Sequence, residues 1–206
     1  RDEGFLPEAL VNYLARLGWS HGDEEMFSRE QLVEWFDLEH VSQSPARFDP
    51  GKLAWLNQQY LKAADNSRLA QLVAAPLKML GAAIERGPPL EAVVALLKDR
   101  ATTIPHLAEA AMLFYTDPGP QAVPQNLRPA LDALKAQLEK SPWDRKSLST
   151  AVSAVLKEHN LKMPQLAMPL RVLLTGHEQT PSLDALLELL GRETVLNRLT
   201  GQLERR

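Results

Sequence analysis

Apolar side chains recur at three- and four-residue intervals along almost the whole chain, and this spacing constrains the fold more than any other feature. Residues spaced in this way share one face of an α-helix, whereas a strand would alternate apolar and polar residues. Near the N-terminus the pattern runs through Leu6, Leu10, Tyr13, Leu14 and Leu17. Pro7 is favoured at a first helical position and Gly18 after a last turn, so the sequence predicts one amphipathic helix between them.

Start and stop signals predict further helices, and strands have almost no support. Ser28 and Gln31 form a capping-box pattern, and Pro76 is expected to cut the apolar run between residues 66 and 86. Helix N-caps are expected at Ser28, Asp49, Asp144 and Ser182. The later helices are predicted at about 90–98, 104–115, 127–140, 144–159, 165–174, 182–190 and 193–203.

The predicted fold class is all-α, with small helical bundles placed in series. No self-similarity with a fixed period of about 30 to 50 residues is present, so a solenoid is not expected. Proline and glycine crowd residues 116–124, which predicts a domain boundary there. The expected parts are 1–66, 67–121 and 122–206.

Charge is unevenly distributed along the chain. Residues 1–50 hold 4 basic and 11 acidic side chains, while residues 51–206 hold 19 basic and 15 acidic ones. The second part is compatible with RNA contact, although its excess of positive charge is small. The absence of cysteine excludes disulfides and thiolate metal sites, and no window approaches the roughly 18 apolar residues of a membrane span. A cytoplasmic protein that contacts no membrane is expected.

No catalytic signature is present in the sequence. Glycine-rich phosphate loops and the nucleophile elbow are missing, and the five histidines are too scattered to predict a metal site. The acidic run at residues 23–25 is expected to stay solvated. Trp35 and Trp55 could stack on bases but lie on apolar helical faces, so both are expected in the core.

Arg171 is the most informative candidate for function. It lies among apolar residues in the segment PLRVLLTG (169–176), shortly before a helix start at TPSL (180–183). Arginine donors read the edges of unpaired bases, and free N–H groups at a helix start bind phosphate. A structural arginine would instead extend to solvent or pair with Glu178 or Glu193. The pattern alone leaves both interpretations open.

Four motifs together resemble bacterial glutamyl-tRNA synthetases. NYLARLGW (12–19) and FDPGKLAWLNQQY (48–60) are similar to the stem-contact region of that family. PLRVLLTG and TPSL are similar to its anticodon-reading part, and the middle of the chain matches mainly through AEAAMLFY (108–115). The resemblance implies a stem-contact domain over 1–66 and a two-part anticodon-binding domain over 67–121 and 122–206.

The resemblance also implies what this chain lacks. The family activates glutamate with ATP and magnesium and transfers it to tRNA, using an HIGH-type tetrapeptide and a KMSKS-type lysine loop. Neither motif is present, and residues 1–4 are similar to the sequence that follows the lysine loop. The chain is therefore expected to be a C-terminal fragment of a class I synthetase that binds no cofactor and is inactive alone.

Site residues follow from the resemblance position by position. Arg171 matches an arginine that reads an anticodon base, and Thr180, Pro181 and Leu183 match the pocket around another base. Arg100 matches a second anticodon arginine in the middle part. The implied partner is tRNA-Glu, with tRNA-Gln left open, and the chain is expected to be a monomer that binds no DNA. The alternative is a helical protein–protein interaction module derived from a synthetase.

Overall fold

A computed structural model describes residues 3–42 and 45–205. Within these residues the chain is helical and has no strand, apart from an isolated bridge between Trp19 and Val41. The predicted all-α fold is confirmed. Arg1 and Asp2, which belong to the segment similar to the sequence that follows the lysine loop, lie outside the described residues.

The helices of the described residues follow one another with short connections. The α-helices are α1 Pro7–Arg16, α2 Arg29–Trp35, α3 Pro50–Ala63, α4 Asn66–Met79, α5 Leu90–Leu97, α6 Ile104–Ala111, α7 Arg128–Lys140, α8 Arg145–Glu158, α9 Met163–Thr175, α10 Leu183–Leu190 and α11 Arg192–Leu203. The 3₁₀ turns are η1 Ile84–Arg86, η2 Lys98–Arg100, η3 Met112–Phe114 and η4 Gln125–Leu127.

Side chains at the helix starts explain several of these boundaries. The Ser28 hydroxyl accepts from the backbone N–H of Gln31, whose side chain accepts from the N–H of Ser28, so the predicted capping box forms. Asp49 and Asp144 likewise accept backbone N–H groups at the starts of α3 and α8. These bonds satisfy donors that have no partner inside the helix.

Local predictions were wrong for Pro76 and for both tryptophans expected in the core, of which Trp35 is half-buried outside the apolar clusters. Pro76 lies inside α4 and does not cut it, because the helix continues to Met79. Because proline has no N–H, the carbonyl of Leu72 loses the helical hydrogen bond that residue 76 would donate. Leu72 is 41% exposed, so water can replace this bond. Trp55 is 43% exposed, because the neighbouring Leu53 and Leu56 fill the buried face of α3.

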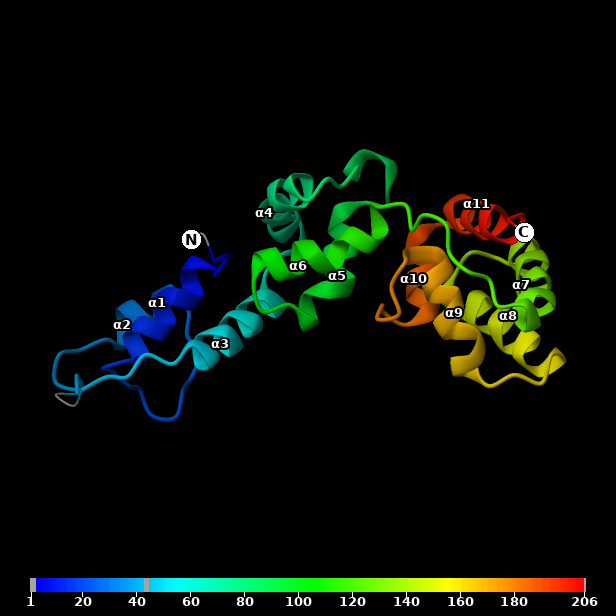
Figure 1. The fold of residues 1–206 in the computed structure, drawn as a ribbon. Helices are drawn as coiled ribbons and strands as arrows, with labels where there is room; N and C mark the ends of the chain where they lie inside the picture. The colour runs from blue at the N-terminus through cyan, green and yellow to red at the C-terminus, as the bar shows by residue number, and fades with distance from the viewer. Residues whose placement is uncertain (1–2, 43–44, 206) are drawn as a thin grey trace.

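Figure 1 shows an elongated molecule with three groups of helices: an N-terminal group (α1–α3), a middle group (α4–α6) and a C-terminal group (α7–α11). Helix α1 packs on α3, α4 packs on α5 and α6, and α8 packs on α7 and α10. Most buried apolar side chains form one cluster that runs from Leu6 to Leu203 through all three groups, and Tyr13, Leu53 and Leu56 form a second cluster in the N-terminal group. This continuous contact fixes the neighbouring groups against each other.

Asn57 joins the N-terminal and middle groups. It is fully buried on α3, where its Oδ1 accepts from the backbone N–H of Leu6 at 2.8 Å. Its Nδ2 donates to the carbonyl of Thr102 at 2.6 Å, and the adjacent Gln58 donates to the carbonyl of Asp99 at 3.0 Å. Helix α3 therefore holds both ends of the short turn that carries Arg100.

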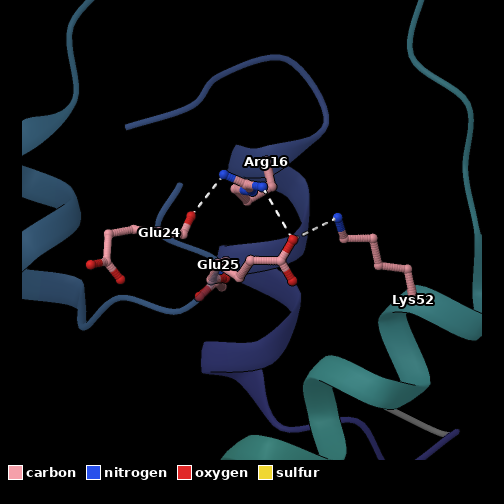
Figure 2. Close-up of polar contacts among 5 residues, drawn as sticks. Arg16, Glu24, Glu25 and Lys52 are labelled. Atoms are coloured by element: carbon pink, nitrogen blue, oxygen red, sulfur yellow. Dashed lines mark hydrogen bonds and ion pairs between the residues drawn. The ribbon is translucent and has the colours of Figure 1, made fainter. Parts of the chain in front are cut away.

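Glu25 is held by two cations in the N-terminal group. Arg16 donates to the carbonyl of Glu24 at 2.7 Å and approaches the carboxylate of Glu25 at 3.5 Å, as Figure 2 shows. Lys52 reaches the same carboxylate at 3.4 Å from α3. The acidic run thus binds the loop before α2 to α1 and α3, a role that the sequence analysis did not predict.

Candidate nucleic-acid interface

Helix α9 positions Arg171 at the edge of the C-terminal group. Leu170, Leu173 and Leu174 on α9 are buried, whereas Arg171 is only half-buried. The helix ends at Gly176, which adopts a left-handed conformation with φ of 77° that favours glycine. Buried leucines therefore hold the backbone of α9 while the arginine side chain reaches the surface.

The Arg171 cavity is a surface hollow of about 470 Å³. Its walls combine the apolar side chains of α9 with the start of α10, including the predicted residue Leu183. It is lined by Ser149, Val152, Met163, Pro164, Ala167, Met168, Arg171, Ser182, Leu183 and Asp184. Interaction with Ser182 lowers the pKa of Asp184, so a carboxylate and the guanidinium of Arg171 both line the cavity.

The guanidinium of Arg171 has an unpaired donor. Its Nε is buried and has no hydrogen-bond partner among the described residues. Within the same residues no ion pair joins Arg171 to Glu178 or Glu193, the acids expected for a structural arginine. An unpaired buried donor is costly, so the described residues do not supply the partner that a purely structural arginine would have.

The Arg100 cavity is a second hollow of about 420 Å³, and it lies between the middle and C-terminal groups. Arg100 is exposed at the end of η2, and Thr180 and Pro181 face it from the loop before α10. The cavity is lined by Leu96, Leu97, Asp99, Arg100, Ala101, His106, Ala110, Leu113, Gln179, Thr180, Pro181 and Ser182. The fold thus brings Arg100 to a loop about 80 positions later in the sequence.

Ser182 lines both cavities, so the two hollows adjoin. The five predicted site residues are divided between them: Arg171 and Leu183 in one, Arg100, Thr180 and Pro181 in the other. Thr180 is less available than expected, because its hydroxyl donates to the carbonyl of Pro181 at 3.0 Å.

Ser182 occupies the N-cap position of α10, but its side chain makes no capping bond. The prediction of its position was right, and the predicted capping contact was wrong, because the Ser182 side chain accepts from no backbone N–H of the first turn. The first backbone N–H groups of α10 therefore lack the side-chain acceptor that a capping serine would supply.

Five further polar residues that the sequence analysis missed line the cavities: Asp99, His106, Ser149, Gln179 and Asp184. No motif marked them: Asp99, His106 and Gln179 come together only where the middle and C-terminal groups pack, and Ser149 and Asp184 only where α8 packs on α10. The described residues contain no cluster of three or more His, Asp and Glu side chains that could hold a metal ion. In those residues no helix is long and apolar enough to cross a membrane.

A family model described as "Anticodon binding domain" matches residues 53–203, which is most of the chain. The chain belongs to this family. A second model, "tRNA synthetases class I (E and Q), catalytic domain", matches residues 1–55. The N-terminal segment of this chain is therefore similar to part of a synthetase catalytic domain. The anticodon-binding match does not favour the alternative of a protein–protein interaction module.

Relatives confirm the resemblance seen in the motifs. Glutamate–tRNA ligases from Burkholderia lata and Burkholderia cenocepacia are each 56% identical to this anticodon-binding chain over 98% of its length. The chain spans 45% of the length of each of these relatives. It corresponds to a portion of a class I synthetase.

Solved structures agree with the relatives. The crystal structure of a glutamate tRNA ligase from Elizabethkingia meningosepticum, in complex with its amino acid, matches all of this chain and 42% of its own, with a TM-score of 0.86 and 26% identity. Glutamate-tRNA synthetase from Elizabethkingia anophelis matches 99% of this chain and 42% of its own, with a TM-score of 0.82 and 26% identity.

Proposed function

We propose that the chain is the tRNA-binding portion of a glutamate–tRNA ligase and that its two adjoining cavities receive unpaired anticodon bases. The observation behind this proposal is a half-buried Arg171 that forms no ion pair among the described residues and lines an open hollow in a chain of the anticodon-binding family. Sequence-specific RNA recognition targets splayed-out bases whose edges bond to side chains and whose faces contact flat or apolar groups. Both cavities offer one arginine and an apolar wall.

The Arg171 cavity fits a pyrimidine edge. The guanidinium donates to a ring carbonyl, and the carboxylate of Asp184 accepts from an exocyclic amino group, a combination that cytosine provides. Met163 and Met168 line the same cavity and offer polarizable contacts to the face of the base. In the adjoining cavity Arg100 donates to a second base, while backbone groups near Thr180 complete the contact.

The whole ligase would attach glutamate to tRNA-Glu in the cytoplasm, using ATP and magnesium. We assign the contacts with ATP and magnesium to other parts of the whole ligase. We assign the chain only the RNA contacts: stem contact over 1–66 and anticodon contact over 67–121 and 122–206, made as a monomer. Whether tRNA-Gln is also bound stays open.

Filter binding tests the proposal. The chain is titrated against transcripts of tRNA-Glu, tRNA-Gln and an unrelated tRNA at several salt concentrations. We expect tighter binding of tRNA-Glu than of the unrelated tRNA, and a decrease in affinity with salt because phosphate contacts release counterions. Equal affinity for tRNA-Glu and the unrelated tRNA would reject the proposed anticodon site.

A further inference from the structure

The segment of residues 116–124 links the middle and C-terminal groups, and helix α11 binds it through two side chains. Arg198 donates through Nη2 to the carbonyl of Thr116 at 2.9 Å. Gln202 donates to the carbonyl of Gly119 at 2.6 Å and accepts from the backbone N–H of Gln121 at 2.9 Å. Arg198 and Gln202 are four residues apart and therefore share one face of α11. This segment is held along its length by α11.

The second bond of Arg198 reaches the candidate interface. Its Nη1 donates to the carbonyl of Leu174, in the last turn of α9 and three residues after Arg171. The guanidinium of Arg198 thus donates both to Thr116, directly after the middle group, and to Leu174, on the helix that carries Arg171. Arg198 is partly buried, and within the described residues it forms no ion pair, so its donors act on the backbone.

Arg192 provides a comparison on the same helix. It also donates to two backbone carbonyls, those of Glu139 at 2.7 Å and Ser141 at 2.6 Å. Both carbonyls lie at the end of α7, inside the C-terminal group. Arg192 therefore joins two helices of the C-terminal group, α11 and α7. Arg198 instead joins α9 to the segment that leads to the middle group.

We infer that Arg198, supported by Gln202, is a positioning residue that sets the separation and orientation of the Arg100 and Arg171 cavities. This inference rests on the proposed function, because the spacing of the cavities matters only if each receives one base of the same RNA. Binding two splayed bases at once requires both sites in one geometry, and a looser junction lowers the effective concentration of the second site for the tethered base.

The first test measures the junction without RNA. The chain has no cysteine, so Glu91→Cys on α5 and Lys157→Cys on α8 place one spin label on each side of it. Both positions are exposed. We expect Arg198→Gln to broaden the distance distribution in a double electron–electron resonance measurement, and the matched variant Arg192→Gln to leave it unchanged. An Arg198→Gln distribution equal to that of the labelled parent would overturn the inference.

The second test measures the affinity for a tRNA-Glu transcript in a double-mutant cycle. We expect Arg198→Gln to weaken binding about five- to tenfold, and to have little effect once Arg171→Ala is present, because positioning acts through Arg171. A purely structural role would give the same loss in both backgrounds, and that result would reject the inference. Suppose that the parent shows no preference for tRNA-Glu while Arg198→Gln still broadens the distribution of distances between the spin labels. In that case the proposed function fails, and the role of Arg198 in holding the two groups together stands.

Discussion

Replacing Asn57 by alanine should destabilise the chain more than most single substitutions. The side chain is fully buried, and its amide satisfies two backbone groups that belong to different helical groups. Alanine would leave the N–H of Leu6 and the carbonyl of Thr102 without these partners. The amide of Asn57 joins α3 both to the start of α1 and to the residues that follow η2. Its removal therefore tests how much this junction of the N-terminal and middle groups contributes to stability.

The expected magnitude follows from the burial of the two partners. An unsatisfied buried backbone group costs about 1 to 3 kcal/mol. Leu6 is buried, so its N–H bears that cost in full, whereas Thr102 is half-buried and water can replace part of its bond. We therefore expect Asn57→Ala to lower the free energy of unfolding by about 2 to 4 kcal/mol.

Urea unfolding followed by far-ultraviolet circular dichroism measures this change. The matched control is Gln58→Ala, the adjacent residue on α3, which loses one exposed bond to Asp99 and should cost less than about 1 kcal/mol. Asn57→Asp keeps the acceptor for Leu6 but places a carboxylate oxygen against the carbonyl of Thr102, so it should also be strongly destabilised. If Asn57→Ala and Gln58→Ala had the same free energy of unfolding, the expected cost of the unsatisfied backbone groups would be refuted.

Three smaller effects are expected elsewhere. A hydrogen bond from Arg68 lowers the pKa of Glu8, so this pair stabilises the chain above the ordinary pKa of glutamate and the effect is lost as the pH falls through the lower folded-state pKa. Arg68→Gln should reduce stability at pH 7 by at most about 1 kcal/mol and have no effect near pH 2, and an equal loss at both pH values would contradict this. Ser28→Ala should cost about 1 kcal/mol and speed amide hydrogen exchange in α2, whereas unchanged exchange would show that the capping box is unimportant. Burial raises the pKa of Tyr115 to about 12, so Tyr115→Phe should abolish the last step of an ultraviolet titration, and survival of that step would assign it to another tyrosine.

Helix identity could be predicted from the sequence because local signals agree with one another. At α2 the capping box, and at α8 the N-cap Asp144, lie beside apolar runs of helical period, and both helices form where expected. Exposure was harder to predict. Trp55 lies on a face that looks apolar in sequence, yet α3 contacts neighbours on one side only, so the tryptophan is left partly in solvent.

The candidate site could be predicted only in part. Arg171 stands out because a charge in an apolar run has few structural explanations, and its Nε has no partner among the described residues. The meeting of Arg100 with Thr180 depends on packing between two groups of helices, which no local pattern encodes. The same holds for Arg198, whose two acceptors are backbone carbonyls that leave no trace in the sequence.

The most direct test of the account compares two RNAs and two arginines. Affinities are measured for a tRNA-Glu transcript and for the same transcript with its anticodon loop replaced, using Arg171→Ala and the control Arg68→Ala, which removes an exposed arginine paired with Glu8. We expect Arg171→Ala to cost about 1 to 3 kcal/mol on tRNA-Glu and nothing on the replaced loop, and Arg68→Ala to affect both RNAs equally. Equal losses for Arg171→Ala on the two RNAs, or no loss on either, would contradict the claim that this residue reads an anticodon base.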